Sequence, residues 1–263
     1  MNKFTYALAL GAGLVLSLAG PSLQAAPIVQ QLATPQMSAE QFNSLFKPIP
    51  GVAPITSSYQ FMQTPTTGMV QSQVFQGEGA AEGLYAYAYQ IAVNNVTDLS
   101  GEPTSVNSAS LQFNATPVAA NFTGVEGAEP AAAYVITDGQ VGGLNLPQAA
   151  PGSIIQSPTS VAWLPGTKTG ALTFQYLDAT QNTGPLEAGA TSATIVILSS
   201  HEYTTQPVSL QNANPQIGYP TAYSAQGGEI HEVPIPEPSA VLAWAGILGA
   251  LAVVRQVRRR RSA

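Results

Sequence analysis

The sequence predicts an all-β protein built around a single β-sandwich of immunoglobulin-like or jelly-roll-like type. Three observations favour this class. Several short segments alternate large apolar residues with small or polar ones, which is the period-2 pattern of strands. Glycines and prolines, 24 and 21 in number, separate these segments at turn positions. The middle of the chain has no long apolar pattern of helical period, so we expect strands rather than helices to form the core.

The expected elements follow in chain order. A short helix is expected near residues 38–46, where Ser38 can cap the N-terminus. The clearest strand is 84–93, and shorter ones are expected at 111–113, 133–137, 161–163 and 172–177. Residues 194–198 are continuously apolar and β-branched, which predicts a strand buried on both faces. One face of the clearest strand carries Tyr85, Tyr87, Tyr89, Ile91 and Val93. The core is expected to contain Trp163, Phe174, Phe113, Tyr87 and Ile197.

Composition changes along the chain divide it into five expected segments. Residues 1–25 form a signal peptide, and 26–67 a Pro-rich lead-in. Residues 68–203 form the β-sandwich domain, and 204–235, again polar and Pro-containing, a linker. Residues 236–263 form a separate tail. No internal repeat of fixed period is present, which argues against a propeller or a solenoid.

The charges are distributed unevenly along the 263 residues. The formal charge of −6 combines 8 basic and 14 acidic residues, and six of the basic ones lie in the first three or last nine positions. Between residues 26 and 238 only Lys47 and Lys168 are basic, while all 14 acidic residues lie there, so this span carries −12. Such an acidic protein is a poor partner for nucleic acid. The absence of cysteine excludes disulfides, thiolate metal sites, cysteine nucleophiles and a lipoprotein anchor.

The N-terminus has the three parts of a secretory signal. Lys3 gives a positive start, residues 6–20 are almost wholly apolar, and small residues follow the break at Pro21. The apolar run is short for a membrane span. We therefore expect a signal helix that signal peptidase removes after Ala25, with Ala26 as the alternative position.

The C-terminus also has three parts in a fixed order. Pro236-Glu237-Pro238 ends a proline-rich, extended stretch. Residues 239–254 are uncharged and apolar, and as a helix they would reach about 24 Å, a marginal membrane span. A basic cluster follows, which would stay on the cytoplasmic side. It consists of Arg255, Arg258, Arg259, Arg260 and Arg261.

These 28 residues closely resemble the PEP-CTERM sorting signal, a bacterial family of C-terminal tails. The resemblance rests on the tripeptide, the transmembrane segment 239–254 and the Arg cluster 255–261, together with the N-terminal signal. It implies export through the inner membrane of a Gram-negative-type envelope. It also implies a transient membrane anchor, removal of the tail by an exosortase, and a mature protein at the cell surface or in an extracellular matrix. An association with extracellular polysaccharide or biofilm is implied as well. The resemblance does not extend to the domain between the two ends.

Motifs for catalysis or cofactor binding are missing from the sequence. No Gly-x-Ser-x-Gly elbow, P-loop or His-Glu-x-x-His is present. The two histidines, His201 and His231, each precede a glutamate, but they lie 30 residues apart. We interpret them as polar loop residues rather than metal ligands. Ser199 and Ser200 adjoin His201, but adjacency in sequence does not make a catalytic triad. We expect no catalytic, metal-binding or cofactor-binding residue.

Paired carboxylates leave two alternatives open. Glycosidases use two carboxylates, and calcium needs only oxygen ligands, so the middle domain could be a secreted carbohydrate-active enzyme or a calcium- or glycan-binding adhesion module. The candidate pairs are Glu78 with Glu82, Glu126 with Glu129, and Asp138 with Asp178. No pair stands out, and the acidic residues are interpreted as a solvated surface. The favoured hypothesis is a non-enzymatic exported protein.

Overall fold

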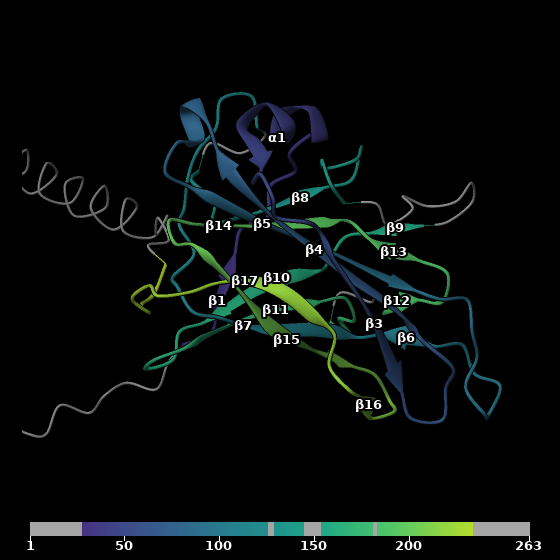
Figure 1. The fold of residues 1–263 in the computed structure, drawn as a ribbon. Helices are drawn as coiled ribbons and strands as arrows, with labels where there is room; N and C mark the ends of the chain where they lie inside the picture. The colour runs from purple at the N-terminus through teal and green to yellow at the C-terminus, as the bar shows by residue number, and fades with distance from the viewer. Residues whose placement is uncertain (1–27, 126–128, 145–153, 181–182, 234–263) are drawn as a thin grey trace, which may run out of the picture.

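Two antiparallel sheets of six and nine strands pack against each other (Figure 1). The computed structural model describes residues 28–125, 129–144, 154–180 and 183–233. The six-stranded sheet has the order β1 (Gln30–Leu32), β10 (Ser160–Leu164), β11 (Gly170–Gln175), β7 (Ser108–Phe113), β15 (Tyr203–Gln211) and β17 (Thr221–Ala225). These sheets confirm the sandwich architecture expected from the sequence.

The nine-stranded sheet branches around one long strand, β5. Its main path is β16 (Gln216–Ile217), β3 (Ile55–Phe61), β4 (Gly68–Gly77), β5 (Tyr85–Val93), β13 (Thr191–Ser192) and β9 (Ile155–Gln156). β14 (Thr194–Ser199) pairs with β5 and with β8 (Ala133–Ile136), and β2 (Phe46–Pro48) pairs with β4. Only the short β13–β9 pair is parallel within this sheet. A separate ribbon joins β6 (Ser105–Val106) to β12 (Leu186–Glu187).

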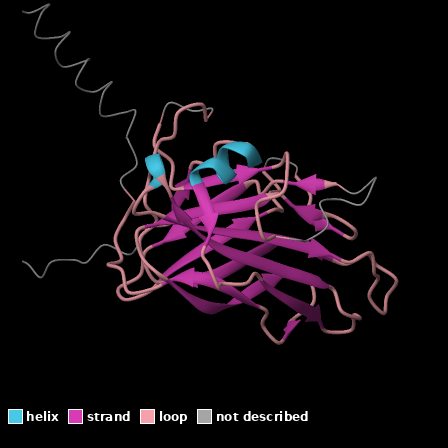
Figure 2. Cartoon of the chain, turned by 45° about the horizontal axis from the view of Figure 1, so that its top comes forward, coloured by secondary structure: helices cyan, strands magenta, loops and turns pink. Residues whose placement is uncertain are grey.

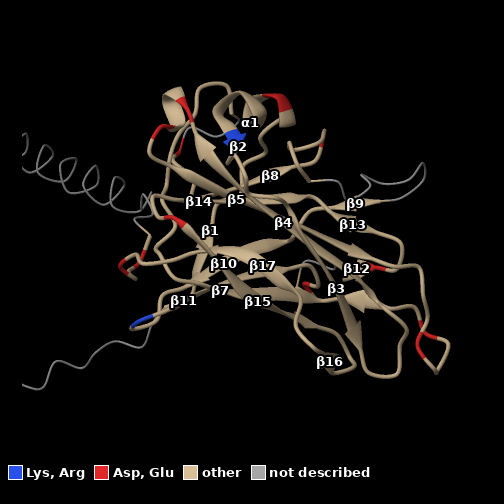
Figure 3. Cartoon of the chain, viewed as in Figure 1, with Lys and Arg blue, Asp and Glu red and all other residues tan. Residues whose placement is uncertain are grey.

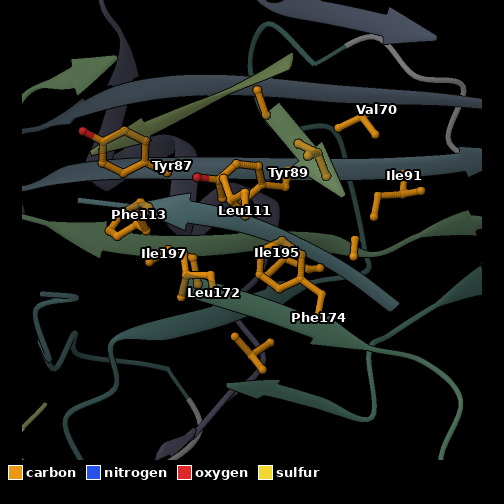
Figure 4. Packing of buried hydrophobic residues seen from close by; sticks show 14 of the residues in the cluster. Val70, Tyr87, Tyr89, Ile91, Leu111, Phe113, Leu172, Phe174, Ile195 and Ile197 are labelled. Atoms are coloured by element: carbon orange, nitrogen blue, oxygen red, sulfur yellow. The ribbon is translucent and has the colours of Figure 1, made fainter. Parts of the chain in front are cut away.

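The main core lies between the two sheets. Alternate residues of β5 point into it, and Tyr87, Tyr89 and Ile91 meet Phe113 and Phe174 from the opposite sheet (Figure 4). All five residues expected in the core are at most 1 % exposed. Strand alternation explains this success, because a pleated strand places every second side chain on the same face.

The nine-stranded sheet is also covered on its outer face. The helix α1 (Ala39–Leu45), the short helix η1 (Gly79–Ala81) and nearby loops lie there (Figures 1 and 2). Phe42 and Phe46 stack with ring centroids 5.1 Å apart, and Phe42 meets Phe75 of β4 edge-on. Because of this second layer, β14 is buried on both faces, as predicted. The layer also buries Ala86 and Ala88 on the outer face of β5.

The helix α1 begins where the sequence predicts. Ser38 accepts a hydrogen bond from the Gln41 backbone N–H, and the Gln41 side chain accepts one from the Ser38 N–H, which makes a complete capping box. The carboxylate of Asp138 accepts a further bond from the Ala39 N–H at 2.9 Å. These acceptors satisfy amides that a helix end otherwise leaves unpaired.

Strands also form on both sides of the range 68–203. β1, β2 and β3 come from the segment interpreted as a lead-in, and most of β15, with β16 and β17, comes from the segment interpreted as a linker. Pro207 of β15 lies where that strand changes partner from β17 to β7, a position that tolerates the missing amide. Polar and proline-containing sequence is therefore compatible with strands in both sheets.

The two segments expected to act as targeting signals lie outside the described residues. This applies to the expected signal peptide 1–25 and its cleavage positions, to Pro236, Glu237 and Pro238, to the expected span 239–254 and to the Arg cluster. Within the part of the chain that the structure describes, no helix has the length and apolar character needed to cross a bilayer.

Candidate functional site

A pocket of about 800 Å³ lies at one end of the sandwich and brings the two histidines together. His201 reaches it from the turn between β14 and β15, and His231 from the segment that follows β17. The segment after β7 supplies the facing wall. The lining consists of Thr116, Pro117, Val118, Ala119, Pro130, Ser200, His201, Gly227, Glu229 and His231. The sequence offers no signal for this meeting, since the two histidines are 30 positions apart.

The backbone of His201 is fixed from the core. The Tyr87 hydroxyl donates to the His201 carbonyl at 2.7 Å, and the His201 N–H donates to Ser199 Oγ at 3.1 Å. The ring lies against Gly228, where an added Cβ would be 2.8 Å from His201 Cδ2 and 2.5 Å from the Ala115 Cβ. Glycine is therefore required beside this histidine.

The segment that carries His231 is bound tightly to the sandwich. We refer to residues 228–233 as the C-terminal strap. The Thr116 hydroxyl donates to the Glu229 carbonyl at 2.8 Å and accepts from the His231 N–H at 2.9 Å. The Trp163 indole N–H donates to the His231 carbonyl at 3.1 Å. The strap therefore forms one wall of the pocket as part of the fold.

The strap ends beside the first strand. The amide side chain of Gln30 donates to the Val233 carbonyl at 3.1 Å and accepts from the Val233 N–H at 2.7 Å, as a neighbouring strand would. Val233 is 4 % exposed and belongs to the main core cluster. The two ends of the described chain consequently leave the sandwich side by side.

The pocket offers hydrogen bonding rather than metal binding. Two imidazoles, one carboxylate and two hydroxyl groups line it together with small apolar residues. Neither Glu202 nor Glu232 lines it, so the two His-Glu dipeptides do not converge there. Ser199 bonds to backbone, which gives no support to a serine–histidine pair. Across the described ranges, no group of three His, Cys, Asp or Glu residues is suited to hold a metal ion.

Of the two candidate carboxylate pairs that lie wholly among the described residues, one lines a common hollow. Glu78 and Glu82 line a second hollow of about 470 Å³ together with Lys47, and no aromatic residue lines it. Asp138 caps α1, whereas Asp178 accepts from the Thr180 N–H in a separate turn. The pair of Glu129 with Glu126 cannot be placed, because Glu126 lies outside the described residues.

The acidic residues are spread over loops on several sides of the sandwich (Figure 3). In the described part of the chain Lys47 and Lys168 are the only basic residues. Asp98 shows the local role of such a carboxylate, since it accepts hydrogen bonds from the Ser100 side chain and the Ser100 and Glu102 backbone N–H groups. These bonds lower the pKa of Asp98, and the bond from the Ser100 side chain has the largest effect.

Comparison with protein-family models, with curated proteins and with solved structures gave no match for this chain.

Proposed function

We propose that this chain is an exported, non-enzymatic cell-surface or extracellular-matrix protein with an immunoglobulin-like or jelly-roll-like sandwich. A signal peptide directs its export and is removed by signal peptidase, and a PEP-CTERM tail then holds the protein in the inner membrane until an exosortase removes the tail. The observation that carries this proposal is the order of Pro236-Glu237-Pro238, the apolar run 239–254 and the Arg cluster, together with the N-terminal signal.

The arrangement of the described chain supports this proposal. Gln30 and Val233 are hydrogen-bonded partners, so the segments that lead to the two targeting signals depart from one end of the sandwich. A domain attached in this way can be displayed with its other end away from the bilayer. The acidic, Arg-free surface suits a protein that remains soluble after release.

Intact mass spectrometry of the protein from its native host tests the proposal. We expect a mature N-terminus at Ala26 or Pro27 and a C-terminus that lacks Arg258, Arg259, Arg260 and Arg261. Replacement of Pro236-Glu237-Pro238 by three alanines should leave the tail in place and the protein in the membrane fraction. A mature wild-type protein that keeps the Arg cluster would refute removal of the tail.

A glycan-binding module is the second candidate function, and the pocket favours it. Its volume falls in the range of small-molecule sites, and imidazole, carboxylate and hydroxyl groups are suited to a sugar hydroxyl array. A glycan array distinguishes a glycan-binding protein from a surface protein without a glycan ligand. The array compares the wild-type protein with a His201→Ala, Glu229→Ala double variant. Binding that the double variant keeps would exclude the pocket as the glycan site.

A further inference from the structure

The C-terminal strap places the folded domain directly before the expected processing motif. Val233 is the last described residue, and only Pro234 and Ile235 separate it from Pro236. Three virtual bonds of 3.8 Å limit the distance between the Cα atoms of Val233 and Pro236 to about 11 Å. While the strap is attached, a protease that binds the tripeptide must therefore reach within about 11 Å of Val233.

The strap is held along its whole length. Gly228 donates to the Asn114 carbonyl at 3.0 Å, and both the N–H and the hydroxyl of Thr116 donate to the Glu229 carbonyl. Further along, Trp163 bonds to His231, and Gln30 bonds twice to Val233. The backbone of Gly228, Glu229, His231 and Val233 is therefore hydrogen-bonded to the sandwich, and the side chain of Val233 is buried.

Proteases commonly bind their substrates as an extended strand through main-chain hydrogen bonds on both sides of the scissile bond. For a motif so close to Val233, the residues on the N-terminal side include the end of the strap. Those residues cannot bond to Gln30 and to a protease at once. Attachment of the strap to the sandwich and binding to the protease therefore compete.

We propose that detachment of the strap from the sandwich controls removal of the tail. This inference rests on the proposed function, because it concerns the rate of the same processing event. The peptide bond that breaks lies beyond Val233, and its acyl group passes to water or to an acceptor amine. While the strap is attached, the free segment before the tripeptide is too short for the protease to bind as an extended strand. Local opening that detaches the strap frees the residues that the protease needs.

Two kinds of change separate strap detachment from other effects. Thr116→Val keeps the shape of the side chain and removes the hydroxyl that bonds to the strap, while Gln30→Ala removes the bonds at its other end. An insertion of eight Gly and Ser residues between Val233 and Pro234 leaves every strap contact intact and supplies a free segment. The matched control is Thr104→Val, a buried threonine whose hydroxyl donates to the Val96 carbonyl away from the strap.

Pulse-chase labelling in the native host measures the conversion of precursor to mature protein. Thr116→Val and Gln30→Ala should each accelerate tail removal by about tenfold, the change expected from the loss of one or two hydrogen bonds. The insertion should also accelerate it, because it supplies a free segment with the strap still attached, and Thr104→Val should not. Amide exchange at His231 and Val233 of the purified domain should accelerate in the strap variants alone.

The possible failures are distinguishable. If the wild type, the strap variants and the insertion lose the tail at one rate, strap control is overturned while the proposed function stands. The same conclusion follows if Thr104→Val accelerates removal as much as Thr116→Val, because general destabilisation would then be the cause. If no variant, the insertion included, ever loses its tail, the proposed function fails and the inference fails with it.

Discussion

Gly170 of β11 is the position where a single methyl group should disturb the core most clearly. The six-membered ring of Trp163 lies directly over it, and a Cβ built on Gly170 would be 1.7 Å from Cη2 and 2.3 Å from Cζ3 of that indole. Trp163 is fully buried, meets Phe113 edge-on at 6.4 Å and donates to the strap. Gly170→Ala therefore cannot be accommodated without movement of the ring.

The cost follows from two contributions. Overpacking of a filled core costs about 1–3 kcal/mol. Movement of the indole also weakens its hydrogen bond to the His231 carbonyl, which contributes about 1 kcal/mol. We expect Gly170→Ala to lower the free energy of unfolding by about 3 kcal/mol, and the melting temperature by roughly 6–12 °C for a domain of this size.

Urea denaturation followed by far-ultraviolet circular dichroism checks this value, because this signal does not depend on Trp163. Gly184→Ala is the control, because its added Cβ would meet only Glu187 Oε1, at 3.7 Å, and it should change stability by less than about 0.5 kcal/mol. In a Trp163→Leu background the cost of Gly170→Ala should fall to below about 1 kcal/mol, since the clashing ring is gone. Equal costs in the two backgrounds would refute the packing of this indole on Gly170.

Three further predictions concern the cap and the titrating groups. Ser38→Ala should destabilise the domain by about 1 kcal/mol in urea denaturation, and Ser38→Asp should keep most of the cap; equal loss in both would contradict it. Burial raises the pKa of Tyr134 to about 12, so the stability from its neutral form is complete below about pH 10 and is lost as pH rises through 12. In an ultraviolet titration the difference between the wild type and Tyr134→Phe should be centred near pH 12, and a difference centred at the ordinary value of about 10 would contradict this. The lowered pKa of Asp98 stabilises its loop above about pH 3.9, and this is lost as pH falls through the folded-state value. Carboxyl NMR should place the Asp98 midpoint below 3.9, and a midpoint at or above it would be the contrary result.

Several elements could be predicted because their patterns are local. The alternation of Tyr87 and Tyr89 with small residues fixes one face of β5, and the apolar run of β14 requires burial on both faces. Ser38 specifies a helix start without reference to the rest of the chain. These features depend on neighbours within a few positions, and the structure confirms each of them.

The strands β1 and β15 could not be predicted in this way. β1 has three residues and owes its place to β10, while β15 contains Pro207 and pairs with two different strands along its length. These strands depend on distant partners more than on their own pattern, since Gln30 of β1 pairs with Trp163 and Leu210 of β15 pairs with Ala109. The burial of Ala86 and Ala88 depends likewise on the α1 layer, which covers the outer face of β5.

The sequence by itself determined the strand pattern, the helix cap and the two terminal residue patterns on which the proposed export route rests. Each of these is written in contiguous residues whose propensity, charge or polarity acts locally. Only the tertiary structure decided that His201 and His231 share a pocket and that Gln30 holds Val233 at the end of the strap. The physical reason is that these contacts join segments 30 and about 200 positions apart, so they exist only once two sheets have packed and closed the chain on itself.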